Sequence, residues 1–237
     1  MKSIWKREMQ GYFYTPLGYI YLIVFALSAT FIFFAANLYP RSSDVSGYYA
    51  MLSTLWMLLT PLLVMRLIAG ERRQMTDQLL LTAPMPVSRW VTGKFLAAVT
   101  VLFMAALLTC IHMLIVALWG QLFIMEYLTI LLGFVLQGMA FTALDFMVSS
   151  LCRSPTTAFL LALGANLLVW LSDLLADAIA IPAIQSMLNR ISLYDRLQPF
   201  LLGQLSVANL IYFVSFSVLC VVLSIQFVDA RRWSEWI

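Results

Sequence analysis

Six long apolar segments follow one another along the chain, separated by shorter polar stretches. Each has about the 17 to 25 residues that an α-helix needs to cross the hydrocarbon core of a membrane. The apolar runs are continuous and lack the alternation of a membrane β-barrel, which favours spanning helices. The predicted spans are Leu17–Ala36, Tyr49–Met65, Phe95–Leu118, Tyr127–Val148, Thr156–Leu174 and Val207–Val228.

The composition supports a membrane protein. Hydrophobic residues make up 63% of the chain and charged residues 11%, against about 45–50% and about 25% in soluble domains. So few polar side chains cannot cover a surface that faces water, so lipid must cover it. We therefore expect an all-α integral membrane protein in which residues 1–237 form a single transmembrane domain.

The positions of Lys and Arg predict the orientation. With the N-terminus inside, only Arg41, Arg190 and Arg196 of the fourteen Lys and Arg residues fall outside. Short cytoplasmic loops carry an excess of these cations in membrane proteins. Both termini are therefore expected in the cytoplasm.

Residues 1–16 are predicted to form an amphipathic helix that lies along the inner face of the membrane. At 100° per residue, Trp5 and its apolar neighbours fall mostly on one side, whereas Lys6, Arg7 and Gln10 fall on the other. Cations on such a helix lie near anionic lipid headgroups. The alternative is a simple basic flank of the first span.

Two further segments do not span. The inner loop 70–94 has helical composition from Glu71 to Leu81 and is then interrupted by Pro84 and Pro86. It is either a short helix that crosses beneath the membrane or a plain polar hairpin. The outer segment 172–206 is too polar to span and too apolar for a free loop, which predicts short re-entrant or interfacial helices before the last span.

Few polar groups lie inside the predicted spans. His112 is expected to be a neutral imidazole that is hydrogen-bonded within the bundle. Asp145 is interpreted as a carboxylate at the inner end of its helix, with pairing to Arg153 or a role in coupling as alternatives. Pro61 is a candidate break in the second span.

The sequence predicts no catalytic chemistry on this chain. One histidine cannot supply a zinc site, and Asp145 and Asp173 fall near opposite membrane faces. A phosphate-binding loop needs G-x-x-x-x-G-K-[ST], but Phe95 follows Gly93-Lys94, and Ser88 stands where the first Gly belongs. We expect no catalytic residue, metal or cofactor here, so any ATP and Mg²⁺ must be bound by another chain.

Three stretches together resemble the permease subunits of ABC-2 type transporters, in particular the gliding-motility and copper-site-maturation branch. The first joins Glu8 to the entry of span one, the second is the inner loop, and the third leads into the last span. They are Glu8 with Tyr14–Ile20, Glu71–Pro84 with Gly93-Lys94-Phe95, and Phe200 and Gly203 followed by Ile211–Phe213 and Arg231-Arg232.

The resemblance implies a permease subunit of an exporter in a bacterial inner membrane. Two ATP-binding subunits are expected beneath a pair of permeases, either a homodimer or two paralogues, with a possible auxiliary extracytoplasmic subunit and no nucleic-acid partner. Loop 70–94 would carry the coupling helix, Cys152–Pro155 a second contact, and residues 1–16 the connecting helix. The implied ATPase-coupling residues are Glu71, Arg72, Arg73, Thr76, Asp77, Leu80, Arg89 and Arg153, and those of the interfacial helix are Trp5, Lys6 and Arg7.

Two other functions stay open at this point. A scaffold could use the same ATPase to move an extracytoplasmic partner mechanically. An ion-coupled secondary transporter is the other alternative, although such carriers usually show paired charges or broken helices near the midplane of the membrane.

Overall fold

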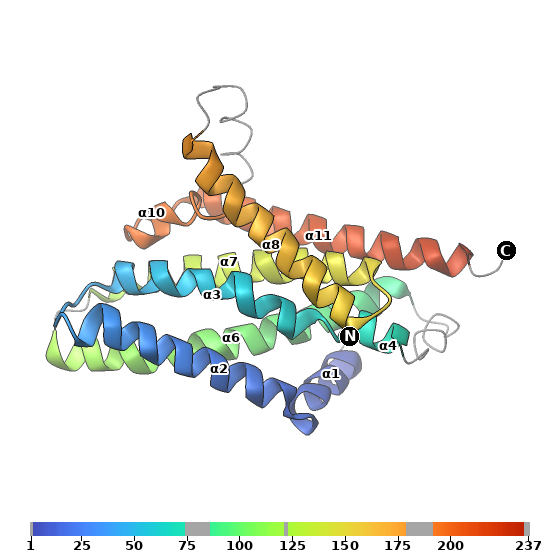
Figure 1. The fold of residues 1–237 in the computed structure, drawn as a ribbon, viewed down its shortest axis with the longest axis horizontal. Helices are drawn as coiled ribbons and strands as arrows, with labels where there is room; N and C mark the ends of the chain where they lie inside the picture. The colour runs from blue at the N-terminus through green and yellow to red at the C-terminus, as the bar shows by residue number, and fades with distance from the viewer. Residues whose placement is uncertain (1, 74–85, 121–122, 179–191, 235–237) are drawn as a thin grey trace.

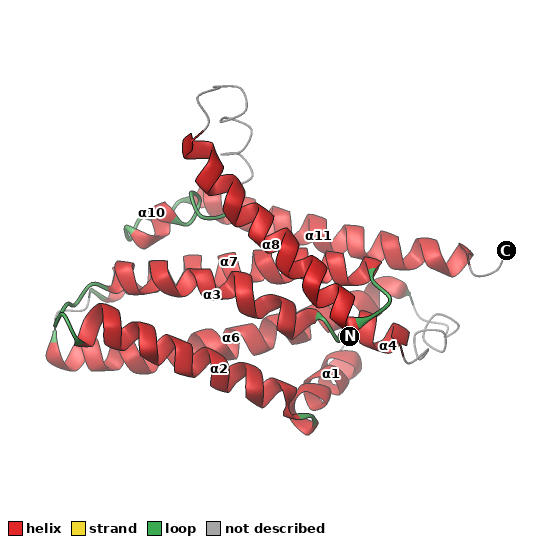
Figure 2. Ribbon diagram, in the orientation of Figure 1, coloured by secondary structure: helices red, strands yellow, loops and turns green. Residues whose placement is uncertain are grey.

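The computed structural model describes residues 2–73, 86–120, 123–178 and 192–234, and these residues form helices joined by turns and loops without a strand (Figure 2). The helices are α1 (Lys2–Tyr14), α2 (Pro16–Phe33), the π-helical η1 (Phe34–Leu38), α3 (Val45–Val64), α4 (Ala69–Arg73), α6 (Val87–Trp119), α7 (Ile124–Leu151), α8 (Pro155–Ala178), α10 (Gln198–Leu201) and α11 (Val207–Ser234).

The predicted fold class is confirmed. Within the part of the chain that the structure describes, six helical segments are long and apolar enough to cross a membrane. They are Pro16–Leu38, Val45–Arg73, Val87–Trp119, Ile124–Leu151, Pro155–Ser172 and Val207–Ala230. Each corresponds to one predicted span, and most extend a few residues beyond it because a helix continues past its apolar stretch.

The third span begins earlier than predicted, because α6 begins at Val87 rather than at Phe95. Pro86 occupies the position before the first helical residue, where no helical hydrogen bond from its backbone nitrogen is needed. Arg89 and Lys94, which were expected in the inner loop, therefore belong to α6. Of the predicted outer helices before the last span, α10 lies within the described residues.

Helix α7 is the centre of the bundle. It contacts α3, α6, α8, α10 and α11, and α11 runs alongside it while α8 crosses over the bundle at an angle (Figure 1). Stacked aromatic rings join α7 to α3 and α2. The ring centroids of Trp56 and Phe134 are 4.6 Å apart, and those of Trp56 and Phe25 are 5.1 Å apart.

A small residue allows the close approach of α3 and α7. The indole N–H of Trp56 donates to the carbonyl of Phe134 at 3.0 Å, which fixes the ring. A Cβ added to Gly138 would lie 2.8 Å from Cε2 of this ring and 3.0 Å from Cδ1 of Leu102. Because Trp56 is fully buried and held by a hydrogen bond, a shift of its ring would cost packing contacts and this hydrogen bond.

Pro61 lies inside α3 and does not end the helix. A proline has no N–H, so the carbonyl four residues earlier, that of Met57, loses its helical partner. The side-chain amide of Asn166 in α8 donates to this carbonyl at 3.1 Å. A neighbouring helix therefore supplies the hydrogen bond that Pro61 removes, as membrane helices allow.

Asp145 is not a helix-end carboxylate, and the prediction on its position was wrong. Its side chain is fully buried in the bundle, on the face of α7 that meets Thr60 and Asn166. Arg153, the partner considered from the sequence, is exposed, and the described residues contain no ion pair between the two. The sequence shows how far along its helix Asp145 lies, but it does not show that the side chain faces the interior of the bundle.

His112 is hydrogen-bonded within the bundle, as expected. Its Nε2 atom lies 3.1 Å from Oγ1 of Thr30, and its Nδ1 atom lies 3.1 Å from the hydroxyl of Tyr48. The Thr30 hydroxyl also donates to the carbonyl of Ala26 at 2.8 Å. The imidazole therefore joins α6 to α2 and α3.

The close approach at Gly138 predicts a difference between two glycines. Gly138→Ala should lower the thermal unfolding temperature in detergent, because overpacking at a rigid ring costs about 1–3 kcal/mol. That cost exceeds the gain of about 1 kcal/mol that alanine brings to a helix. Gly164→Ala is the matched control, because a Cβ there meets no atom within 4 Å. Equal unfolding temperatures for the two variants would contradict this packing.

Candidate functional site

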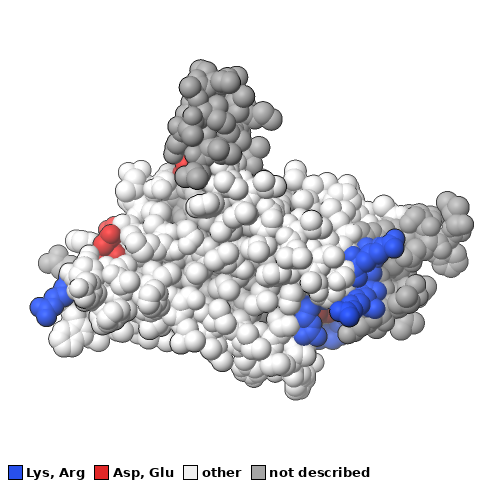
Figure 3. All heavy atoms as spheres, viewed as in Figure 1, with Lys and Arg blue, Asp and Glu red and all other residues white. Residues whose placement is uncertain are grey.

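The basic side chains gather at one end of the bundle, where α1 and α4 lie; we call it the α1 end. Figure 3 shows most of the visible Lys and Arg atoms grouped there. The Lys and Arg side chains that the structure describes at the α1 end are Lys6, Arg7, Arg66, Arg72, Arg73, Arg89, Lys94 and Arg153, and those at the opposite end are Arg41 and Arg196. This end is the candidate site for contact with a partner.

Helix α1 is fixed against the bundle by hydrogen bonds from its aromatic side chains. The hydroxyl of Tyr12 donates to the carbonyl of Leu63 at the end of α3, at 2.7 Å. The indole N–H of Trp5 donates to Oγ1 of Thr100 in α6, at 3.0 Å. Trp5 is still 38% exposed, so its ring packs on α6 with one side and leaves the other open.

The turn between α1 and α2 explains part of the motif at residues 14–20. Pro16 opens α2, where a proline is tolerated. A Cβ on Gly18 would lie 2.7 Å from the backbone oxygen of Tyr12. Only a residue without a side chain allows the two helices to come this close.

Four charged residues form what we call the charged junction: Arg7 and Glu8 of α1, Glu71 of α4 and Lys94 of α6. Nη2 of Arg7 lies 2.7 Å from Oε1 of Glu8 and 2.8 Å from Oε1 of Glu71. Nζ of Lys94 lies 3.1 Å and 2.9 Å from the same two oxygens. Each carboxylate oxygen thus accepts from both cations, and the junction joins three segments that are far apart in the sequence.

Burial makes the charged junction a strong constraint. The side chain of Lys94 is fully buried, and those of Glu8 and Glu71 are 13% and 18% exposed. The ammonium also lies 5.5 Å from the ring centroid of Trp90. A buried charge that loses its partner costs about 3–5 kcal/mol, so the three segments are held together at this point.

Arg7 is the most exposed member, with 49% of its side chain accessible. Partial burial acts to lower the pKa of its guanidinium, but the hydrogen bond to Glu8 and the charges of Glu8 and Glu71 outweigh this and raise the pKa above its usual value. The guanidinium therefore stays charged in the junction, where it can serve both carboxylates.

A second contact joins α4 to the loop between α7 and α8. Nη1 of Arg72 donates to the backbone carbonyl of Cys152 at 3.1 Å. This carbonyl follows the end of α7 and precedes the start of α8 at Pro155. The resemblance to ABC-2 permeases implied two contact points for a partner, loop 70–94 and Cys152–Pro155. The Arg72 hydrogen bond joins these two segments.

The structure divides the predicted residues of the coupling segments and of the interfacial helix into groups. Glu71 of the first set and Arg7 of the second take part in the charged junction, and Arg72 reaches the α7–α8 loop. The side chains of Lys6, Arg73, Arg89 and Arg153 are exposed at the α1 end. Thr76, Asp77 and Leu80 lie outside the described residues.

Sequence reasoning missed the pairing of Glu8 with Lys94. It treated Lys94 as a loop cation and Glu8 only as part of a motif. One signal was available: Glu8 is the only acid in the N-terminal segment, and it follows a cation directly. A single carboxylate there suggests a specific partner elsewhere, but the identity of that partner depends on the packing of α1 against α6.

Removal of the Lys94 charge should weaken the fold. Lys94→Met leaves Glu8 and Glu71 with Arg7 alone, so we expect a loss of about 3 kcal/mol in unfolding free energy, the low end for a broken buried pair because both acids are partly exposed. Lys6→Met, which removes an exposed cation from α1, is the matched control and should have little effect. Thermal unfolding in detergent, followed by tryptophan fluorescence, measures both variants. Similar unfolding temperatures would show that the charged junction adds nothing to stability.

Comparison with known proteins gives the family. The family model described as ABC-2 family transporter protein matches residues 47–228, more than half of the chain. A search of curated proteins finds no match. The matched region runs from the start of α3 to the last turns of α11 and includes Glu71 and Lys94 of the charged junction. The chain belongs to the ABC-2 transporter family and is a transmembrane component of that class.

Proposed function

We propose that this protein is the membrane subunit of an ATP-driven exporter whose ATP-binding subunits are separate chains. Membership of the ABC-2 family supports this, as does the lack of a phosphate-binding loop in the sequence. The motifs at residues 8–20, 71–84 and 200–213 favour the gliding-motility and copper-site-maturation branch. In that case the work of ATP hydrolysis must enter this chain through contacts at one end of the bundle.

The charged junction is the observation that carries the proposal. It ties α4, the start of the proposed coupling segment, to α1 and to α6. A force applied to α4 therefore acts on the connecting helix and on the third span together. An exposed hairpin without these ion pairs would move alone and would transmit little force to the spans.

We place the α1 end in the cytoplasm of a bacterial cell, with the spans in the inner membrane and both chain termini inside. The argument is the distribution of charge, because cations near the ends of spans mark the cytoplasmic side. Eight of the described Lys and Arg side chains lie at the α1 end and two at the other. This orientation puts loop 70–94 where an ATP-binding subunit can reach it.

The exposed arginines of the α1 end are the proposed contact surface. Arg73, Arg89 and Arg153 are exposed and come from α4, α6 and the α7–α8 loop. Guanidinium groups suit bidentate pairing with carboxylates of a partner. Thr76, Asp77 and Leu80, which lie outside the described residues, are proposed as coupling residues from the motif at residues 71–84 alone. Two such chains would each receive one ATP-binding subunit.

An ion-coupled secondary transporter is the second candidate, and a single observation favours it. Asp145 is a carboxylic residue that is fully buried within the spans, and such residues often bind coupling ions. The family match favours the ATP-driven proposal. The experiment on the arginines separates the two, since an ion-coupled carrier needs no ATPase.

The arginine surface predicts a loss of ATPase binding. Arg73→Glu combined with Arg89→Glu should reduce the ATPase activity that co-purifies with the tagged chain from its native membranes about tenfold, because reversed charges repel the acidic partner surface. Photolabelling with an azido-ATP analogue identifies the bound subunit. Arg41→Glu, at the opposite end, is the matched control and should retain full activity. If the wild-type chain purifies without a nucleotide-binding partner, or if all variants retain it equally, the proposal is wrong.

A further inference from the structure

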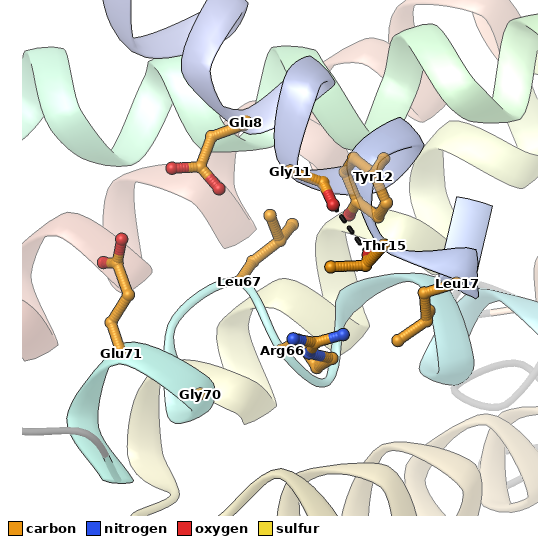
Figure 4. Close-up of a pocket in the computed structure, with 9 residues that line it drawn as sticks. All are labelled: Glu8, Gly11, Tyr12, Thr15, Leu17, Arg66, Leu67, Gly70 and Glu71. Carbon is orange, nitrogen blue, oxygen red and sulfur yellow. Dashed lines mark hydrogen bonds between the residues drawn. The ribbon is translucent and has the colours of Figure 1, made fainter.

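A cavity of about 150 Å³ lies beside the charged junction, between α1 and the stretch that joins α3 to α4. Figure 4 shows the residues around it: the carboxylates of Glu8 and Glu71 lie on one side, the guanidinium of Arg66 lies toward the other, and Leu67 lies between them. The cavity therefore has the two carboxylates of the charged junction at one side, a guanidinium at the other and an apolar side chain between them.

Both sides can still bind a ligand. Arg66 is exposed, and its guanidinium makes no ion pair or hydrogen bond with the described residues. Glu8 uses only Oε1 in the charged junction, and its Oε2 atom makes no such contact within the described part of the chain. A carboxylate offers about four acceptor positions, so Glu8 can take a further donor.

Gly11 shows that the space is available. It lines the cavity, and a Cβ added to it would meet no atom within 4 Å. The position lies within α1, away from the close contact that Gly18 makes with Tyr12. A larger side chain can therefore be placed at position 11, at the wall of the cavity, without a close contact at its Cβ.

The cavity lies at the level where spans begin and end. Leu17, which lines it, is in the first turn of the first span, and Arg66 and Leu67 directly follow α3. Residues at these positions lie near the boundary between hydrocarbon and water. A ligand that enters from the membrane reaches the polar side chains with its headgroup, while its apolar part remains beside Leu17.

We propose that this cavity binds a phospholipid headgroup that carries a primary amine, of the phosphoethanolamine type. The phosphate pairs with Arg66, which suits phosphate as a planar donor of several N–H groups. The ammonium donates to Oε2 of Glu8, on the side of the two carboxylates. A trimethylammonium headgroup has no N–H to donate and is larger, so it fits less well. The bound lipid then joins α1 to the segment that leads into α4.

The test is native mass spectrometry of the delipidated protein in detergent, titrated with dioleoyl-phosphatidylethanolamine, with dioleoyl-phosphatidylcholine and with inorganic phosphate. We expect phosphatidylethanolamine to bind about fivefold more tightly than phosphatidylcholine, the effect of one charge-assisted hydrogen bond. Gly11→Leu, which places a bulky side chain at the cavity wall, should remove this preference. Arg66→Gln, which removes the cation that pairs with the phosphate, should weaken the binding of both lipids, because both carry that phosphate. Arg153→Gln, which removes a cation outside the cavity, is the matched control and should bind both lipids as the wild type does.

Three results would overturn the proposal. In the first, the two lipids bind equally to the wild-type protein. In the second, Gly11→Leu keeps the preference, or Arg66→Gln binds both lipids as tightly as the wild type. In the third, inorganic phosphate at the lipid's concentration displaces the lipid, which makes the site one for free phosphate. Because Arg66 is exposed and its substitution disturbs no packing, the test does not depend on how well Gly11→Leu folds. The result is also independent of ATPase binding, so the function proposed above can fail without affecting it.

Discussion

A buried lysine that needs two carboxylates is the constraint on which the α1 end depends. Lys94 is fully enclosed, and its charge is stable there only while Glu8 and Glu71 remain within reach. Hydrogen bonds of Tyr12 and Trp5 also hold α1, and one from Arg72 holds α4, but the charged junction joins both helices to α6. The ion pairs of the charged junction fix one position for both helices.

Polar contacts continue from this junction into the spans. Arg72 joins α4 to the loop before α8, and Asn166 of α8 supplies the hydrogen bond that Pro61 removes from α3. The aromatic stack around Trp56 then ties α3 to α7. A displacement of α4 therefore has a connected set of contacts through which to act on several spans, whereas the remaining faces of α2 and α8 are largely exposed and apolar.

The six spans could be predicted from the sequence because membrane thickness fixes the length of an apolar helix. The charged junction could not, because it depends on which helices are neighbours. Lys94 was predicted in the inner loop, because the apolar run of the third span begins at Phe95. Its partners Glu8 and Glu71 come from two other segments. Asp145 was misplaced for a similar reason, as only the packing of α7 against α3 and α8 shows which way it faces.

The account requires that the α1 end face the cytoplasm, where ATP is available. Single cysteines at Ser88 in the first turn of α6 and at Ser43 in the α2–α3 loop, both exposed, can be labelled with a membrane-impermeant maleimide in intact cells and in inverted vesicles. The unsubstituted protein, with three native free cysteines, gives the background. The account predicts that Ser88→Cys reacts only in inverted vesicles and Ser43→Cys only in intact cells. Labelling of Ser88→Cys from outside intact cells would contradict it.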